Sequence, residues 1–285
     1  MTTRRWLLLL YLAPCACAFR QPTGGKRQKT ALRSLFTQVI SDVDDTLKSS
    51  GGVNVAGVAL GGIDVQYPRG DLYPGVAEFM LYVSSGSVPP KLAILTARAE
   101  EFKAALELKP DSSLAVALRQ AGQAEGVPDW GVGPVLYGSV AEWIVQDRKG
   151  MRKFSNFERL LQQDPTGAIF QYVYVGDTGE LDQEAGETML REYPEVVKAV
   201  FLHVVSDKKG PVVVPPPKLI NGRPIVFFRT YVGAAVDAVR LGFMSLEGLE
   251  RVMLAATKKL DKVPKTSDKW IDLQLDLDRA NKLLY

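Results

Sequence analysis

The stretch Leu35-Phe-Thr-Gln-Val-Ile-Ser-Asp-Val-Asp-Asp-Thr-Leu47 joins a short apolar run to three carboxylates. The run 35–41 is rich in β-branched and aromatic residues, as in a strand buried on both faces of a parallel sheet. Acidic side chains directly after such a strand repel one another unless a cation neutralises them. Carboxylate oxygens suit magnesium, which also accepts phosphate oxygens. The stretch therefore predicts an α/β fold with a magnesium site at the end of its first strand.

Strand-like and helix-like segments alternate along the rest of the chain. The tail 263–285 fits a helical face through Trp270, Leu273, Leu277 and Leu284, although its apolar residues also alternate as in a strand, and we expect a helix packed on the domain. The alternation predicts a doubly wound, Rossmann-like parallel sheet. Its further strands are expected at 91–95, 134–137, 170–175 and 197–205, and its helices at 75–83, 100–108, 155–163, 182–193 and 233–241.

A second acidic cluster, Gly176-Asp-Thr-Gly-Glu-Leu-Asp182, follows another predicted strand. Because the carboxyl ends of parallel strands meet at one edge of a sheet, Asp177 and Asp182 are expected beside the first cluster. The pair of clusters disfavours the alternative that the first is a polar loop with incidental acids. Thr96, after the second strand, offers a hydroxyl to a phosphate oxygen, and Lys153 offers a cation.

In this order the four elements resemble the motifs of haloacid-dehalogenase-type phosphatases. The resemblance implies that Asp42 is the nucleophile and forms an aspartyl-phosphate. It implies that Asp44 is the general acid for the leaving group and then the base for water. Thr96 and Lys153 would hold the phosphate. Asp45 is expected to support the loop without reacting.

Within this superfamily, residues from about 36 to 207 most resemble the actin-patch-protein-type phosphatidate phosphatases, which are distant relatives of the lipins. It rests on Ser41–Lys48, Tyr73–Val76, the Lys153 helix and Gly176–Asp182. It implies hydrolysis of phosphatidate to diacylglycerol at a membrane surface. The metal ligands implied are Asp42, the backbone carbonyl of Asp44, Asp177 and, through water, Asp182.

Two departures concern substrate selection. The Thr96 motif reads Leu-Thr-Ala-Arg98 where fungal members have a Ser-Asn-Ser type of sequence, and Gly51–Gly70 is elongated and rich in glycine. Arg98 is a candidate headgroup contact or, with similar weight, a surface salt-bridge partner. The short gap 47–73 leaves room for a flap and for little or no cap. Its apolar residues either touch a membrane or pack on the flap's own core.

Two other functions stay open: hydrolysis of another lipid, sugar or protein phosphate, and a phospholipid-binding module without catalysis. The presence of both Asp42 and Asp44 favours an enzyme, because a pure binding module needs neither a nucleophile nor an acid–base group.

Charge and composition exclude several classes. The 285 residues carry a formal charge of +3, but seven cations precede Asp42, so the remainder carries −4 and nucleic-acid binding is disfavoured. Cys15 and Cys17 are the only cysteines, which excludes thiol chemistry downstream of them. His203 is the single histidine; it makes a Ser-His triad unfavourable, and it is expected in a core strand.

The N-terminus has the pattern of a targeting segment. Residues 1–18 combine a cationic start, an apolar run and Ala16-Cys17-Ala18, which predicts a secretory signal peptide, with an uncleaved signal anchor as the alternative. Residues 19–34 are basic and acid-free, like a transit peptide. The two parts resemble plastid presequences of algae with secondary plastids. We expect a phosphatase domain at 35–262 that enters the secretory pathway, with onward transport to a plastid as a hypothesis.

Overall fold

A seven-stranded sheet forms the centre of the computed structural model, which describes residues 36–55, 58–59, 62–86, 88–99, 109–138, 149–164, 167–179 and 181–285. The sheet order is β5-β4-β1-β6-β7-β9-β8. All neighbouring pairs are parallel except β8 and β9, which are antiparallel. The strands are β1 (Phe36–Ser41), β4 (Leu92–Ala99), β5 (Val132–Gly138), β6 (Ile169–Asp177), β7 (Val197–His203), β8 (Lys218–Ile220) and β9 (Arg223–Phe228).

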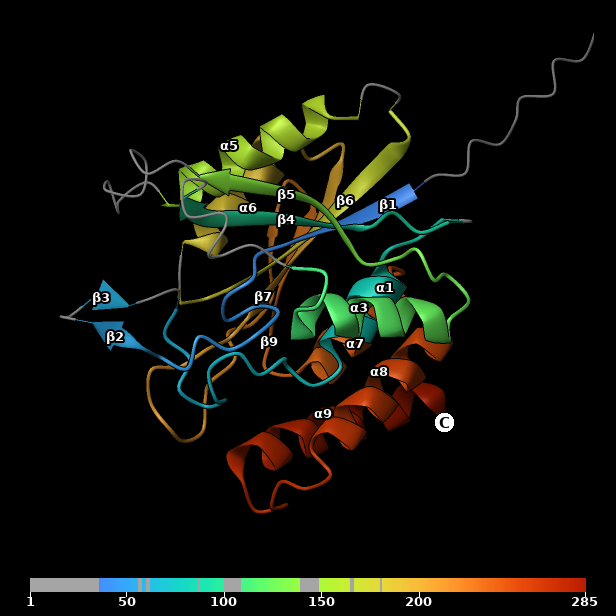
Figure 1. Ribbon diagram of the computed structural model, residues 1–285. Helices are drawn as coiled ribbons and strands as arrows, with labels where there is room; N and C mark the ends of the chain where they lie inside the picture. Colours follow the sequence, from blue (N-terminus) through green and yellow to red (C-terminus); the bar gives the residue numbers. More distant parts are fainter. Residues whose placement is uncertain are drawn as a thin grey trace, which may run out of the picture. The chain divides into compact units, whose positions relative to one another are not determined.

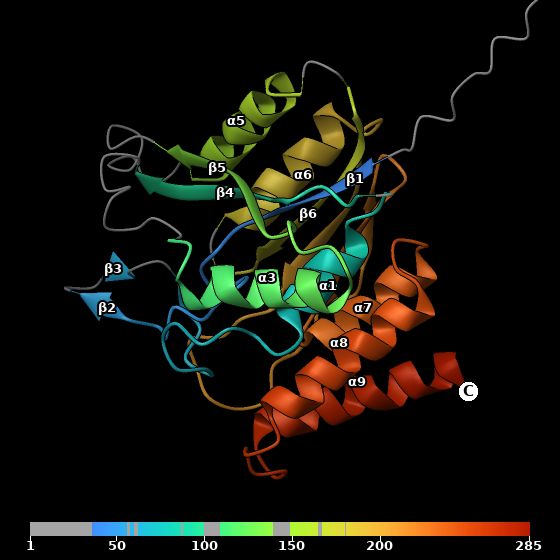
Figure 2. The ribbon, with the colours of Figure 1, turned by 45° about the vertical axis from the view of Figure 1, so that its right-hand side comes forward.

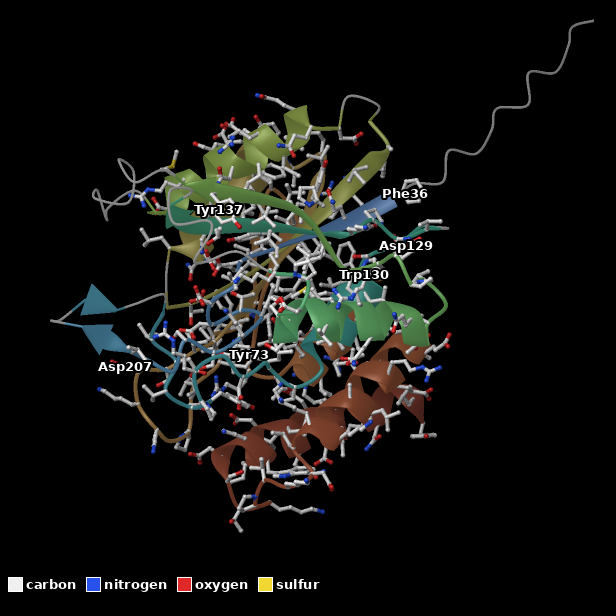
Figure 3. The ribbon with its side chains drawn as sticks, viewed as in Figure 1. Phe36, Tyr73, Asp129, Trp130, Tyr137 and Asp207 are labelled. Atoms are coloured by element: carbon white, nitrogen blue, oxygen red, sulfur yellow. The ribbon has the colours of Figure 1, made fainter. Side chains whose placement is uncertain are left out.

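The strand order has a reversal that positions the site. Counted along the chain, the parallel strands of the described residues lie in the order 3-2-1-4-5-6, and the direction of winding reverses between β1 and β6. Ligands of open α/β sheets bind at such a point, at the carboxyl ends of the strands. Figure 3 labels Phe36 at the amino end of β1 and Tyr137 near the carboxyl end of β5, on opposite sides of the molecule. The α/β class and the mostly parallel sheet expected from the sequence are confirmed.

Helices cover both faces of the sheet (Figure 1). One face packs against α1 (Val76–Val83), α3 (Ser113–Ala124) and α7 (Tyr231–Arg240), and the other packs against α5 (Lys149–Gln162) and α6 (Asp182–Glu192). Successive strand side chains point to opposite faces, so each strand contributes to both cores. Within β1, Val39 belongs to the first core and Ile40 to the second. Because both faces of each strand are buried, the strand sequences are continuously apolar and do not alternate between apolar and polar residues.

The C-terminal part adds an outer layer beside α1 and α7. It consists of α8 (Leu246–Lys259) and α9 (Asp268–Leu284), which lie side by side in Figures 1 and 2. On α9, Trp270 and Leu273 are buried in the core, whereas Ile271 and Leu275 are exposed. This spacing is helical, so the strand alternative for the tail is wrong. The hydroxyl of Ser267 caps α9 by accepting from the amide of Trp270 at 3.4 Å.

The boundaries of several elements differ from the predictions. β4 continues past Leu95 to Ala99, so Thr96 lies inside the strand, because β5 pairs with β4 as far as Ala99 after β1 has ended. β7 ends at His203, two residues before the expected end. The sequence analysis did not predict α3, α8 or β8. Between β1 and α1 the described chain forms the short antiparallel pair β2 (Asn54–Val55) and β3 (Val58–Ala59).

Some predictions fall on residues outside the described ranges. These are the targeting segments 1–18 and 19–34, the helix 100–108 and the side chain of Arg98, although the backbone of Arg98 belongs to β4. Within the described ranges, none of the helices combines the length and the apolar character that a membrane crossing requires.

Candidate metal and phosphoryl-transfer site

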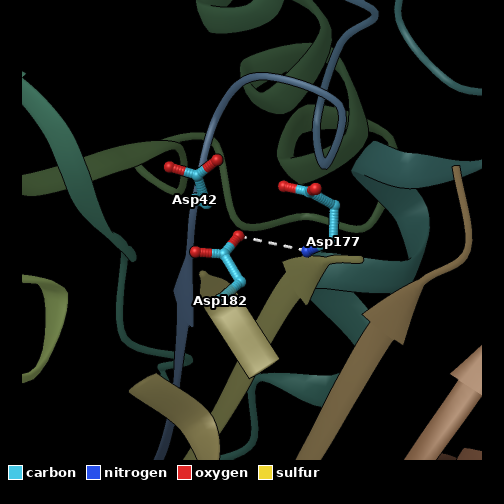
Figure 4. Close-up of side chains that lie close together, drawn as sticks. All are labelled: Asp42, Asp177 and Asp182. Carbon is cyan, nitrogen blue, oxygen red and sulfur yellow. Dashed lines mark hydrogen bonds between the residues drawn. The ribbon is translucent and has the colours of Figure 1, made fainter. Parts of the chain in front are cut away.

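Three carboxylates meet at the winding reversal of the sheet. Asp42 follows β1 directly, Asp177 is the last residue of β6, and Asp182 is the first residue of α6. One oxygen from each of the three groups lies within 4.8 Å of the others, and all three side chains are buried (Figure 4). The acidic strand ends of the sequence thus form one cluster, as expected.

Strand pairing and a glycine produce this convergence. Ser41 pairs with Val175, and the amide of Asp42 donates to the carbonyl of Val175 at 3.1 Å, which sets Asp42 beside the end of β6. At Gly176 a Cβ atom would lie 2.7 Å from the Cβ of Asp182, so a side chain there would displace α6. The amide of Asp177 donates to Oδ2 of Asp182 at 3.1 Å and fixes that carboxylate (Figure 4).

Lys153 brings a cation to the cluster from helix α5. It lies on α5 and is 1% exposed, and its Nζ is 3.1 Å from Oδ1 of Asp42. The same ammonium pairs with Oδ1 of Asp182. A buried lysine is stable as a cation only with such partners. The structure thus brings Lys153 together with two of the three predicted acids.

The donor set fits a divalent cation of the magnesium type. Three carboxylates lie together in a region closed to solvent, and Lys153 contacts two of them. Carboxylates crowded in a buried site repel one another, and a divalent cation shared between them relieves that repulsion. The clustered groups are all carboxylates, whose oxygens hard cations such as Mg²⁺ prefer. The ligand set therefore suits a hard divalent cation.

Thr96 and Asp44, two further predicted site residues, also lie near the carboxyl-end edge of the sheet. Thr96 is buried in β4. The last residue of β4 that pairs with β1 is Ile94, opposite Ser41, and Thr96 lies two residues beyond it. Asp44 lies in the loop after β1, is half-buried, and its backbone pairs with that of Lys48. Its carboxylate is not one of the three clustered groups of the described chain. The ligation that the resemblance implies for Asp44 uses its backbone carbonyl and stays a prediction.

Asn156 is a site residue that the sequence analysis missed. It is buried on α5, one turn after Lys153, and its Nδ2 donates to the carbonyls of Leu136 at 3.2 Å and Thr96 at 3.5 Å. Arg159 donates to Oδ1 of Asn156 at 3.0 Å. These bonds hold α5, and with it Lys153, against the ends of β4 and β5. An amide within the apolar face of the helix was the available signal, because buried amides require partners.

His203 is buried at the end of β7, in agreement with the core-strand expectation. Its Nδ1 lies 2.8 Å from the carbonyl oxygen of Asp45 and its Nε2 lies 3.2 Å from that of Arg229. Burial, helped by the charge of Arg229, lowers the pKa of His203 to about 4, although both carbonyls favour the charged ring. The ring is therefore neutral at pH 7 and has a structural role beneath the loop.

The arrangement combines a buried carboxylate at a strand end, an ammonium group in contact with it, and two further acids that can share a cation. This set can bind a phosphoryl group together with a metal, and it supplies an oxygen nucleophile. Within the described ranges, it is the single group of three or more acidic, histidine or cysteine side chains with metal-binding spacing. No family model, no curated protein and no solved structure matches the chain.

Proposed function

We propose that this protein is a magnesium-dependent phosphatase of the haloacid-dehalogenase type, with phosphatidate as its leading substrate. The observation that carries the proposal is the buried cluster of Asp42, Asp177 and Asp182 with Lys153 at the winding reversal of the sheet. Three carboxylates crowded in a buried site repel one another, which is unfavourable in a purely structural cluster. A divalent cation that shares the three carboxylates would relieve that repulsion.

In the proposed reaction a carboxylate oxygen of Asp42 attacks the phosphorus of a phosphomonoester. The bond from phosphorus to the leaving oxygen breaks, and protonated Asp44 gives that oxygen its proton. Asp44, now ionised, then takes a proton from a water molecule, whose oxygen attacks the phosphorus of the aspartyl-phosphate. The bond from phosphorus to the Asp42 oxygen breaks, inorganic phosphate leaves, and both aspartates return to their starting state.

Lys153 and Thr96 have supporting roles in this scheme. The ammonium of Lys153 orients Asp42 through its 3.1 Å contact and offsets negative charge as the phosphoryl group arrives. Thr96 offers its hydroxyl to a phosphate oxygen. When bound, Mg²⁺ would neutralise charge on the carboxylates and on the phosphoryl oxygens.

The choice of phosphatidate is supported by the resemblance of the motifs and by the small amount of regular structure in the connection between β1 and α1. In the described part of that connection the regular structure is limited to the two-residue strands β2 and β3. A site without a large lid suits a phosphate headgroup presented at a lipid surface.

Phosphate release by the full chain tests the proposal with two substrates, phosphatidate in mixed micelles and a soluble aryl phosphate, each with and without Mg²⁺. Magnesium-dependent release from phosphatidate is the expected result. Release from the aryl phosphate alone would keep the reaction and discard the lipid substrate. Binding of phosphatidate micelles without release from either substrate would favour the non-catalytic lipid-binding module.

A further inference from the structure

The carboxylate of Asp45 connects both ends of the segment 50–64, which contains β2 and β3. Its Oδ1 accepts from the amide of Ser50 at 2.7 Å, and its Oδ2 accepts from the amides of Ile63 at 2.6 Å and Asp64 at 2.8 Å. The side chain is fully buried. Hydrogen bonds to an ionised acceptor are about twice as strong as neutral ones. One side chain therefore fixes the base of this segment to the loop that carries Asp42.

The backbone of Asp45 is held from two further sides. Its φ of 56° is left-handed, a conformation that Asp tolerates better than most residues. Its amide donates to the carbonyl of Lys48 at 2.7 Å, and its carbonyl oxygen lies 2.8 Å from Nδ1 of His203 at the end of β7. Left-handed backbone at a residue other than glycine persists where the surroundings enforce it, and such positions cluster at functional sites.

Ile63 extends this connection to the second acidic loop. A Cβ atom on Gly179 would lie 2.7 Å from Cγ1 of Ile63 and 3.1 Å from Oδ1 of Asp177, so Ile63 packs directly over this glycine. The amide of Gly179 donates to Oδ1 of Asp177 at 2.6 Å. The contacts run from Asp45 through Ile63 and Gly179 to Asp177, one of the three clustered carboxylates.

We propose that Asp45 is a positioning residue for magnesium binding, because it holds Ile63 against Gly179 and thereby sets the orientation of the Asp177 carboxylate. This inference rests on the proposed function for the identity of the metal. It assigns a role in the metal site to a residue outside the cluster itself. It also makes the metal affinity depend on the position of Ile63.

Three substitutions in the full chain test this role. Asp45→Asn retains the shape and the tolerance of left-handed φ, but its amide nitrogen must face at least one of the three N–H donors. Gly62→Ala disturbs the hydrogen bonds of Asp45 without changing Asp45 itself, because the new Cβ would overlap Oδ2 of Asp45. Gly70→Ala is the matched control: Gly62 and Gly70 both have positive φ, 145° and 83°, but no atom lies within 4 Å of a Cβ on Gly70.

The readout is the dissociation constant of Mg²⁺ alone, measured by titration calorimetry without substrate, with thermal unfolding to confirm that each variant is folded. Loss of a group that orients a metal ligand costs about 10-fold or more in affinity. We expect that loss in Asp45→Asn and in Gly62→Ala, and near wild-type affinity in Gly70→Ala. If Asp45→Asn does not fold, Gly62→Ala decides.

Three outcomes would overturn the inference, and they differ in what else they overturn. Wild-type affinity in folded Asp45→Asn and Gly62→Ala would refute the positioning role and leave the phosphatase proposal intact. Failure of the wild-type chain to bind Mg²⁺ would refute the proposed metal site and the positioning role with it. An equal loss in all three variants would also refute it, since the effect would then come from loop strain.

Discussion

Nζ of Lys153 lies 3.1 Å from Oδ1 of Asp42, and the two side chains are 1% and 5% exposed. The same ammonium pairs with Asp182, so one cation contacts both the acid that follows β1 and the first residue of α6. In a buried ion pair the removal of one partner leaves the other charge without compensation. Lys153 is therefore expected to matter for stability as well as for catalysis.

Replacing Lys153 by Met should lower the free energy of unfolding by about 3 kcal/mol when no divalent ion is present, because the buried carboxylates of Asp42 and Asp182 then lose their ammonium partner. Saturating Mg²⁺ should restore part of this loss, since a ligand that binds only the folded state stabilises it. Urea unfolding with and without Mg²⁺ measures both effects. Lys258→Met is the control, since Lys258 forms no ion pair with the described residues. Equal stabilities of the Lys153→Met variant and the control would refute the role of Lys153.

Replacing Asp44 by Asn should leave folding and Mg²⁺ affinity near those of the wild type, because the carboxylate of Asp44 is not part of the cluster and the backbone carbonyl is retained. Turnover should fall by about 10²- to 10⁴-fold, the usual contribution of a general acid–base group. With an aryl phosphate, whose leaving group needs little protonation, the aspartyl-phosphate should accumulate, because the second step lacks its base. Acid quenching followed by peptide mapping detects it. A wild-type turnover rate would show that Asp44 has another role.

His203 gives a prediction that does not depend on catalysis. It is the only histidine of the chain, so its ring proton gives a unique NMR signal. We expect a titration midpoint near pH 4, because burial lowers the pKa to about 4 from the ordinary 6.5. We also expect the proton of the neutral ring on Nδ1, because its 2.8 Å contact with the carbonyl of Asp45 is shorter than the 3.2 Å contact of Nε2 with the carbonyl of Arg229.

The same shift implies a dependence of stability on pH. Between pH 6.5 and 4 the unfolded chain binds a proton on His203 that the folded chain does not bind. This contribution to stability is complete above pH 6.5, and about 3 kcal/mol is lost as the pH falls to 4. Urea unfolding across this range measures the loss. An NMR midpoint at or above 6.5 would show that the two carbonyl acceptors outweigh burial.

The sequence predicted the acidic cluster well because its geometry follows from one rule. Parallel strands bring their carboxyl ends to the same edge, so the acids after β1 and β6 meet there whatever the details of the loops. The helix that carries Lys153 was placed less well, because α5 begins at Lys149, six residues before the helix expected at 155–163. The helical tail followed from the spacing of Trp270 and Leu273.

Other features depend on contacts between distant segments, so their partners could not be read from local patterns. β4 extends past Thr96 because β5 pairs with it there, and no signal near Thr96 reports that partner. Asn156 and Asp45 act through backbone groups of other segments: Asn156 binds the carbonyl of Leu136, and Asp45 binds the amide of Ile63. The sequence predicted that Asp45 supports the loop, and only the fold shows that its carboxylate does so by accepting from the amides of Ser50, Ile63 and Asp64.

The most direct test of the account compares magnesium-dependent phosphate release by the wild-type chain and by Asp42→Asn, with phosphatidate micelles and the aryl phosphate as substrates. We predict release by the wild type that requires Mg²⁺, and none above background by Asp42→Asn at any Mg²⁺ concentration, because an amide is a poor nucleophile and a poor metal ligand. Comparable release by the folded variant would contradict the assignment of Asp42 as the nucleophile.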